Sequence, residues 1–391
     1  MKFPKITSSR PKSCFSLKQN GFSLIEFMIT SVIALFLVLG MSQVFLASRS
    51  GYELAQAKSR MQESARIGIE SIQRDIRMSG YMGCVNDGAR IRNQEIFVRL
   101  AGASNFRTFN GVNFQSNFAR GAEGFEATNT APGEELTLNA GAPAWTPALP
   151  AILRGLPAPG SDVLVLRYLS PERARLLDFA PDVSGPTVQV DTSVTGPVVA
   201  NRVYALSNCN QVSFFVPTSV SGSGDTFVAS GLTGAEFYNI STSYLYEVTR
   251  VAYYVGVEPA TDTNGLFRYV MDEGQAAPQE AYVPNVASLQ VLYGWDTQLP
   301  LPDGAVNQFG TAAQLSTATV GTQTAFSRVG QIRAGLLMVE NTNARRSSAQ
   351  AERGNPERIL GADISPEETE LDQLTDVYET TASPRNHLFG Y

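Results

Sequence analysis

The sequence predicts an α+β protein in which one long N-terminal helix precedes a β-rich globular part. Two observations support this fold class. A helical pattern continues over residues 22–80, apolar throughout its first half and amphipathic in its second. After residue 160, short β-branched and aromatic runs alternate with Gly, Pro, Asn and Asp, as in a sheet with tight turns. The 391 residues allow either one large domain or two smaller ones.

Residues 1–21 form a basic leader with five basic residues and no acid. An apolar run follows from Phe22 to Ala47, and about 20–25 residues suffice for a helix to span a bilayer core. Glu26 is the only charged residue in this run. A carboxylate in such a segment costs roughly 2.5–3.5 kcal/mol on insertion scales, so it needs a partner or a function. We predict a transmembrane helix over residues 22–47.

Two simpler interpretations explain less of this pattern. An ordinary secretory signal has an apolar core of about 7–15 residues and a cleavage site after it. Here the run is longer, and the candidate cleavage glycine, Gly21, precedes it. A plain membrane anchor explains the length but neither the Gly21-Phe22 junction nor Glu26. The basic leader favours a cytoplasmic N-terminus, which places everything after the anchor outside the cytoplasm.

The helix is expected to continue through residues 48–80 as an amphipathic segment. Charged residues, Asp75 among them, are expected to lie away from its apolar face. Gly80 is expected to end the helix, because glycine readily adopts the left-handed conformation found after helix C-termini. An ordinary core helix would give the same pattern. The apolar face consists of five residues at helical spacing: Met61, Ala65, Ile69, Ile72 and Ile76.

Residues 81–391 are predicted to form one β-rich head. Residues 85–160 are rich in Gly, Asn, Ala and Pro and are expected to form a long connection with little regular structure. A hairpin is expected to turn at Asn264-Gly265, which Asp262 and Thr263 precede; a calcium loop there would lack its closing glutamate. The predicted strands cover residues 162–168, 187–190, 198–206, 211–216, 245–257, 266–270, 286–295 and 329–339.

The composition excludes several kinds of chemistry. The chain has a net charge of −6, which becomes −11 without the five basic leader residues, so we expect no direct nucleic-acid binding. The only histidine is His387, close to the C-terminus, and no lysine follows Lys58. A catalytic triad, a zinc site and a phosphate-binding loop are therefore not expected. Glycosidase-like carboxylate pairs remain open, but we predict no enzyme, metal or cofactor.

Two further features concern the part outside the membrane. Cys14 lies in the leader, so Cys84 and Cys209 are the only cysteines expected in an oxidising compartment, and we predict a disulfide between them. Residues 363–379 contain seven acidic residues. Such a run is typical of a solvated face, and a partner or cation site is the alternative.

The N-terminal motif Gly21-Phe22-Ser23-Leu24-Ile25-Glu26-Phe27-Met28-Ile29 resembles the type III signal of type IV prepilins. Later segments resemble the PilW group of minor pilins, although Pro384 departs from that family's closing strand. The carrying segments are Arg77-Met78-Ser79-Gly80-Tyr81-Met82-Gly83-Cys84, Ser207-Asn208-Cys209-Asn210-Gln211-Val212-Ser213-Phe214, Arg250-Val251-Ala252-Tyr253-Tyr254-Val255, Gly265-Leu266-Phe267-Arg268-Tyr269, 286–294, Gly330-Gln331-Ile332-Arg333-Ala334-Gly335-Leu336-Leu337 and 376–387.

The resemblance implies a pilin-like fold, with the helix packed on an antiparallel β-sheet head with long loops. It also implies cleavage between Gly21 and Phe22 by a prepilin peptidase, followed by N-methylation of Phe22. Glu26 would then lie one helical turn from that amine. Because lipid penalises a lone carboxylate, we expect Glu26 to pair with the N-terminal amine of a neighbouring subunit. The alternatives are pairing with its own amine and a role in marking the cleavage site.

The implied function is that of a minor pilin that helps initiate type IV pilus assembly in a tip complex, with links to adhesion, twitching motility and DNA uptake. Expected partners are other minor pilins, the major pilin, a large tip adhesin, the peptidase and, before assembly, inner-membrane lipid. The protein would span the inner membrane once with its head in the periplasm, then enter the fibre or its tip at the cell surface. The alternatives are a minor pseudopilin of a type II secretion system and a plain membrane-anchored binding protein.

Overall fold

The structure is a computed structural model that describes residues 21, 23–84, 97–100, 120–138, 144–182, 185–200, 202–209, 211–230, 232, 238–271, 276–299, 302–321, 323–341, 358–364 and 373–385. Residues 1–20 of the leader, Phe22, His387 and residues 365–372 of the acidic run lie outside the described residues. The chain divides into two compact units, residues 1–53 and residues 54–391.

The long helix predicted from the sequence is α1 (Leu24–Met78), which contains 55 residues. It ends where the sequence predicts, because Gly80 has a φ of +76°. The Ser79 N–H still donates to the Asp75 carbonyl at 3.0 Å, as in an intact last turn. The Gly80 N–H then donates to the carbonyl of Arg167 at 2.9 Å, which attaches the end of the helix to the sheet.

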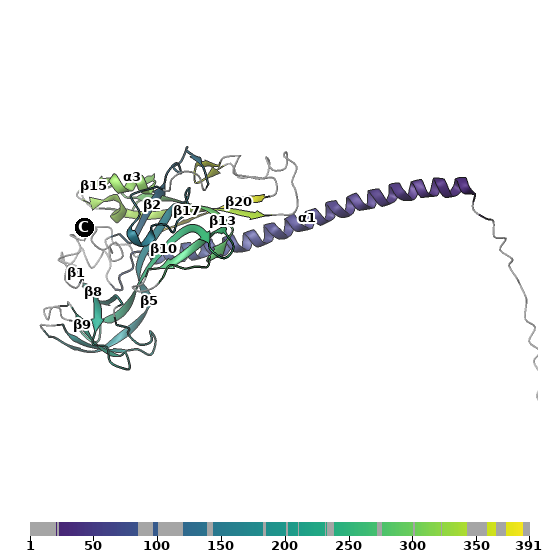
Figure 1. The fold of residues 1–391 in the computed structure, drawn as a ribbon. Coiled ribbons are helices and arrows are strands. Elements are labelled where there is room, and N and C mark those ends of the chain that lie inside the picture. The colour runs from purple at the N-terminus through teal and green to yellow at the C-terminus, as the bar shows by residue number, and fades with distance from the viewer. Residues whose placement is uncertain are drawn as a thin grey trace, which may run out of the picture. The chain divides into compact units, whose positions relative to one another are not determined.

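Two long antiparallel strands, β5 (Val163–Ala180) and β10 (Tyr244–Glu258), form the centre of the head (Figure 1). On the far side of β10 lie β11 (Thr263–Val270) and then β12 (Val283–Pro284). On the far side of β5 lie β2 (Ala122–Ala127) and then β4 (Trp145–Thr146).

At one end of the β5–β10 pair the sheet closes into a barrel. Each strand pairs with the next in the order β5–β6–β9–β8–β7–β10, and β10 pairs back onto β5, all antiparallel. Alternate side chains point inward and form a separate apolar core that includes Val190, Leu206 and Phe215. The added strands are β6 (Thr187–Asp191), β7 (Tyr204–Ser207), β8 (Gln211–Thr218) and β9 (Thr226–Ser230), and β1 (Phe97–Leu100) pairs in parallel with β8.

A second antiparallel sheet has the order β14–β13–β17–β20, formed by β14 (Gln308–Gly310), β13 (Val286–Trp295), β17 (Val329–Asn341) and β20 (Gln373–Ala382). Short pieces complete the described head: η3 (Ala151–Leu153), α3 (Ala312–Thr317), η4 (Ala325–Arg328), the pair β15 (Thr319–Val320) and β16 (Gln323–Thr324), and a small sheet of β18 (Arg358–Ile359), β19 (Ala362–Ile364) and β3 (Glu135–Leu136).

The second half of α1 and the two sheets share one core. Its helical members include Met61, Ala65, Ile72 and Ile76, as the apolar periodicity predicts. They join inward residues of β5 and β10 and, from the second sheet, of β13 and β17. Close approach depends on Gly68, because a Cβ there would lie 3.0 Å from Leu336 Cδ1. The predicted α+β fold, with a long helix on antiparallel sheets, is confirmed.

The structure corrects three local predictions. Residues 85–160 contain more than a connection, because β2 lies next to β5 and all six of its residues are buried. Within residues 198–206 the chain forms a strand only from Tyr204. The closing strand β20 ends at Ala382, so Pro384 lies beyond it and interrupts none of its pairing with β17.

The hairpin between β10 and β11 is confirmed, but its predicted turn is wrong. The last cross-strand pair is Glu258 with Thr263, so the loop is residues 259–262 and Asp262 takes the positive φ of +54°. Gly265 lies inside β11 instead. A Cβ there would lie 2.5 Å from Ala281 Cβ, so the glycine permits the close approach of the next segment rather than a turn.

Candidate functional site

Of the predicted processing and assembly residues at the N-terminus, the structure describes Gly21, which precedes α1, and Glu26, which lies in its first turn. Gly21 and Glu26 are exposed, whereas Phe22 lies outside the described residues. The Ser23 N–H donates to Glu26 Oε2 at 3.4 Å, the contact by which a glutamate in the first turn satisfies an N-terminal donor. Thr30 Oγ1 in turn donates to the Glu26 carbonyl at 2.8 Å. Glu26 therefore lies on the outer surface of the first turn, accessible to another chain.

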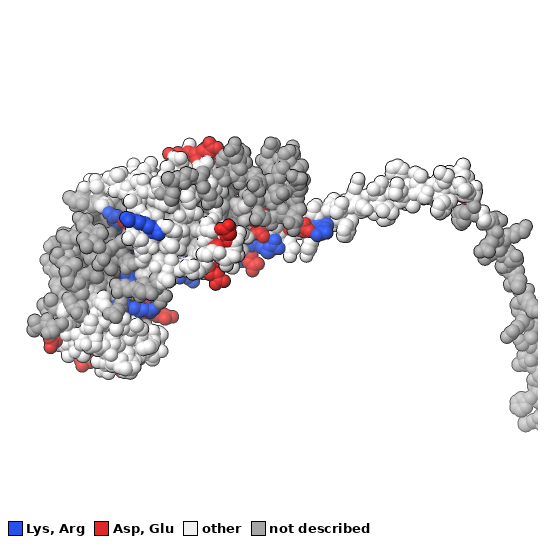
Figure 2. Space-filling view, in the orientation of Figure 1, with Lys and Arg blue, Asp and Glu red and all other residues white. Residues whose placement is uncertain are grey.

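The first half of α1 presents its apolar side chains on the surface. The large apolar residues between Leu24 and Leu46 are 52–78 % exposed. Figure 2 shows this stretch as an almost entirely white surface, in contrast to the blue and red that mark charges on the head. By length and composition, the segment could cross a membrane. None of its most apolar stretch is buried against the rest of the chain. Such a surface requires lipid or other helices around it.

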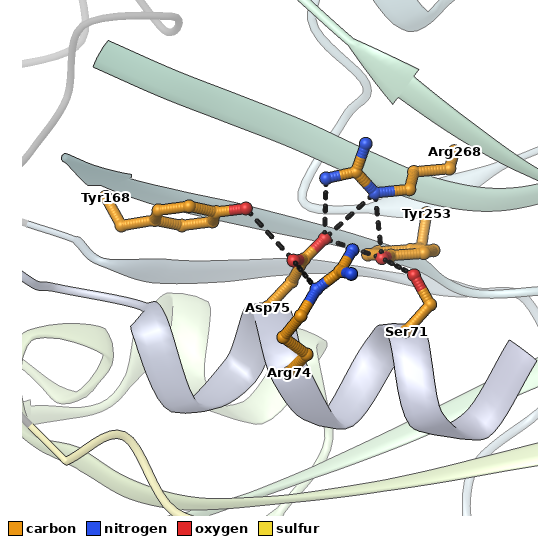
Figure 3. Close-up of polar contacts among 6 residues, drawn as sticks. All are labelled: Ser71, Arg74, Asp75, Tyr168, Tyr253 and Arg268. Carbon is orange, nitrogen blue, oxygen red and sulfur yellow. Dashed lines mark hydrogen bonds and ion pairs between the residues drawn. The ribbon is translucent and has the colours of Figure 1, made fainter. Parts of the chain in front are cut away.

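The second half of α1 carries a buried carboxylate, Asp75, which the helical periodicity had predicted to lie away from the buried face. Asp75 is 1 % exposed and faces the sheet, not the solvent. It accepts hydrogen bonds from the hydroxyls of Tyr253, at 2.6 Å, and Tyr168, at 3.0 Å (Figure 3). Arg268 Nη2 forms an ion pair with Asp75 Oδ2 at 2.9 Å, and Ser71 contacts the Tyr253 hydroxyl at 2.8 Å. We call Ser71, Asp75, Tyr168, Tyr253 and Arg268 the Asp75 cluster.

The pKa values in the Asp75 cluster follow from burial and the fixed negative charge. Burial raises the pKa of the Tyr253 and Tyr168 hydroxyls, and the neighbouring Asp75 raises both further. Burial disfavours the charged form of Arg268, but Asp75 outweighs this effect and raises the pKa of the guanidinium. The tyrosines are therefore neutral donors and Arg268 a permanent cation. The cluster joins α1 to β5, β10 and β11 through one carboxylate.

The segment after α1 is covalently attached to the base of the barrel. Cys84 and Cys209 form the disulfide, with their Cα atoms 4.5 Å apart and a sequence separation of 125. Ser207 Oγ donates to the Met82 carbonyl at 3.0 Å, two residues before the bridge. Gly83, with a φ of +77°, packs against Ser207 and the Tyr246 ring. The bridge thus connects the end of the helix to the β7–β8 connection.

A second acidic site lies between the sheets and does not involve α1. Glu126 and Asp162 are 5 % and 3 % exposed, and Thr130 Oγ1 lies 3.4 Å from Glu126 Oε1 and 3.2 Å from Asp162 Oδ1. Asp162 accepts the N–H groups of Ala127 and Val291, both at 2.9 Å, and Glu126 accepts the N–H of Ala312 at 3.2 Å. We call Glu126, Thr130 and Asp162 the carboxylate pair site.

In the carboxylate pair site, no cation among the described residues balances the charge. Burial raises the pKa of Glu126 to about 9, and the charge of Asp162 adds to that shift. Burial likewise raises the pKa of Asp162 to about 7, although hydrogen bonds from Ala127 and Val291 oppose the change. Nearby, the buried Tyr293 hydroxyl lies against Gly124, where a Cβ would be 2.0 Å from it. Across the described residues, no group of three metal-ligating side chains forms a candidate metal centre.

Sequence reasoning missed both acidic sites. It identified Gly21, Phe22 and Glu26 in the N-terminal motif, and the cysteines Cys84 and Cys209. The Asp75 cluster has one detectable signal, an acidic residue one position before an apolar-face residue, Ile76. Its partners are 93 to 193 residues away in sequence, so spacing alone could not identify them.

A long helix with an exposed apolar N-terminal half, and a second half packed on antiparallel sheets, defines a pilin-like protein. Residues 16–42 match the family described as the prokaryotic N-terminal methylation motif. Residues 252–386 match the family described as type IV pilus-assembly protein W, PilW. Over these residues the chain is similar to type IV pilus assembly proteins of the PilW family and carries an N-terminal methylation motif. No curated protein and no solved structure matches it.

Proposed function

We propose that this protein is a minor pilin that helps initiate type IV pilus assembly as part of a tip complex. The matches to the PilW family and to the N-terminal methylation motif support the coarser role in pilus assembly, a structural role rather than catalysis. The observation that carries the proposal is the exposed apolar half of α1 with one carboxylate, Glu26, in its first turn. A helix of this kind can leave lipid for a bundle of similar helices without losing apolar contact.

Four segments follow from this function. Residues 1–21 are the leader that a prepilin peptidase removes between Gly21 and Phe22, and Phe22 becomes the methylated N-terminus. Residues 22–47 form the transmembrane helix, residues 48–80 the amphipathic spine, and residues 81–391 the head. Gly21 has no side chain, so a peptidase can approach the backbone closely at the membrane face.

Glu26 supplies the selectivity of assembly. A lone carboxylate is penalised in lipid, and an N-terminal amine from a neighbouring subunit neutralises it inside the helix bundle. Because lipid already satisfies the apolar side chains, this charge pairing favours association more than apolar contact does. The exposed position of Glu26 in the first turn of α1 supports this role.

The protein acts in two locations. It spans the inner membrane once, with its head in the periplasm, and then enters the pilus or its tip at the cell surface. Its partners are other minor pilins, the major pilin and a large tip adhesin, besides the peptidase that processes it. Adhesion, twitching motility and DNA uptake depend on the fibre it helps to start.

The proposal is tested by Glu26→Ala, with Glu70→Ala as a matched control. Glu70 is an exposed carboxylate on the same helix, paired with Arg66 at 2.7 Å. We expect both variants to be cleaved at Gly21, as mass spectrometry of the mature N-terminus would show. Glu26→Ala should lower pilus number at least tenfold and lose co-purification with partner pilins, because the amine loses its counter-charge.

Three results would contradict the proposal. Wild-type pilus number with Glu26→Ala would remove the intersubunit role of Glu26. Retention of residues 1–21 in a strain with an active prepilin peptidase would remove the prepilin assignment. A deletion strain with normal pili but defective protein export would assign the chain to a secretion pseudopilus instead.

A further inference from the structure

The short helix α3 covers the carboxylate pair site on the side of Glu126. α3 packs against β2, the strand that carries Glu126, and its Ala312 N–H donates to Glu126 Oε2 at 3.2 Å. Asp162 is held differently, because it accepts the N–H groups of Ala127 and Val291, which belong to the two large sheets. Of the two acids, Glu126 is therefore the one that a movement of α3 would uncover.

α3 is a short element that depends on its neighbours for stability. It contains six residues, and a helix of that length is not stable in isolation. Its buried side chains are Ala312 and Leu315, and its capping box lies within its own first turn. The strands that follow, β15 and β16, pair with each other in a separate two-stranded sheet. Residues 311–321, which we call the α3 flap, can therefore move without breaking a pairing within either large sheet.

Opening of the α3 flap would give water access to Glu126. One oxygen of Glu126 and one of Asp162 lie 3.4 and 3.2 Å from Thr130 Oγ1, so the two buried acids are close together. If both are ionised in a dry interior, they repel each other and each lacks hydration. Burial is also the main cause of the raised pKa of Glu126, and the charge of Asp162 is the second. Hydration of Glu126 removes the main cause, so ionisation of the pair favours an open flap.

The other charged and titratable groups near the site do not offset this effect. The residues of α3, β4 and β16 include none. Tyr293 on β13 is neutral, because burial raises the pKa of its hydroxyl well above the usual value. Glu123 points to the other face of β2 and pairs with Arg120 and Arg167, at 2.7 and 2.8 Å. Arg328 on η4 donates to a backbone carbonyl at 2.6 Å.

We propose that residues 311–321 form a pH-sensitive flap over the carboxylate pair site, closed while the pair retains a proton and open once both acids are ionised. Opening exposes Leu315, which is otherwise fully buried, and so changes the surface of the head. The inference goes beyond the proposed role in assembly. It is measured on the isolated protein, so its outcome does not depend on whether pili form.

Hydrogen–deuterium exchange of the full chain in detergent measures the opening of the α3 flap. Labelling times are shortened about tenfold per pH unit, so that the intrinsic exchange is equal at pH 6 and pH 9. The reporters are the amides of Leu315 and Ala318, which each donate within the flap at 3.0 Å. We expect their protection to fall at least about thirtyfold from pH 6 to pH 9, since one proton allows at most about tenfold per pH unit. β17 should stay protected over the same labelling times, because the sheets remain folded.

Two variants assign the opening to Glu126. Glu126→Gln keeps an acceptor for the Ala312 N–H but cannot ionise, so its flap should stay protected at both pH values. Glu134→Gln changes an exposed acid between β2 and β3 and should behave like the wild type. The proposal is overturned if the wild-type flap is equally protected at both pH values, or if β17 loses protection together with it. It is also overturned if Glu126→Gln loses flap protection as the wild type does.

Discussion

The Asp75 cluster and the carboxylate pair site both bury acid groups, but they balance the charge differently. Asp75 has the guanidinium of Arg268 beside it as well as two tyrosine hydroxyls. Among the described residues, Glu126 and Asp162 accept hydrogen bonds from neutral backbone N–H groups, and the neutral Thr130 hydroxyl lies near both carboxyl groups. Neutral donors stabilise a carboxylate without cancelling its charge, so burial prevails and raises both pKa values. The Asp75 cluster is therefore stabilised by an ion pair, whereas the carboxylate pair site is stabilised by a proton that it retains on folding.

The largest expected effect comes from Asp75→Ala. The change leaves Arg268, whose side chain is 20 % exposed, without its counter-charge, and it removes the acceptor of two tyrosine hydroxyls. Breaking a buried ion pair from one side costs about 3–5 kcal/mol. We expect a loss of that size in the free energy of unfolding of the head, measured by urea denaturation of the full chain.

Arg74→Ala is the matched control for this prediction. Arg74 also contacts Asp75, at 3.4 Å, but its side chain is 66 % exposed. An exposed pair contributes about 0–1 kcal/mol, so this variant should be close to the wild type. If Asp75→Ala and Arg74→Ala lost the same free energy of unfolding, the buried contacts of Asp75 would contribute no more to stability than an exposed ion pair.

The contrast between these sites also shows what the sequence could predict. Met61, Ile72 and Ile76 repeat at helical spacing, so the buried face of α1 followed from local pattern. Asp75 was assigned to solvent because a periodicity argument treats every charge as exposed. Its true environment depends on Arg268, which lies 193 residues later. A single sequence contains no local signal for such a partner.

The closure of the barrel could not be predicted from local sequence pattern either. Runs such as residues 187–190 and 211–216 were predicted as strands and are confirmed as β6 and β8. Their closure requires β10 to pair with both β5 and β7, which is a non-local choice of partners. Gly265 illustrates the same limit. The Asn-Gly signal is a turn preference, but close packing beside Ala281 decides its place in a strand.

The second prediction concerns pH and Glu126→Gln. Because the pKa of Glu126 is raised from 4.5 to about 9, the folded state binds a proton that the unfolded state releases. This contribution to stability is therefore complete below pH 4.5 and is lost as pH rises towards 9. Glutamine keeps an acceptor for the Ala312 N–H and carries no charge. We expect the variant to gain up to about 4 kcal/mol relative to wild type between pH 5 and pH 8, at about 1.4 kcal/mol per pH unit.

Urea denaturation at both pH values measures this gain. Glu134→Gln is the control, because Glu134 is exposed and its carboxylate contacts the Ala131 N–H at a turn. Its difference from wild type should remain nearly constant with pH. If Glu126→Gln were less stable than the wild type by the same amount at pH 5 and at pH 8, the stability of the carboxylate pair site would not depend on protonation of Glu126.

The smallest expected effect comes from Thr130→Val, which tests where that proton lies. The Thr130 hydroxyl has one hydrogen, and the Ala127 carbonyl, at 2.8 Å, is its closest acceptor. Glu126 Oε1, at 3.4 Å, then needs its own proton to donate to Thr130 Oγ1. Valine removes that acceptor, so we expect a loss of about 1 kcal/mol at pH 5–7, where Glu126 is protonated, and less near pH 9. Thr130→Ser keeps the hydroxyl and should retain most of the pH 5–7 stability in the same urea titrations. A loss for Thr130→Val that grows towards pH 9 would instead show that Thr130 donates to an ionised carboxylate.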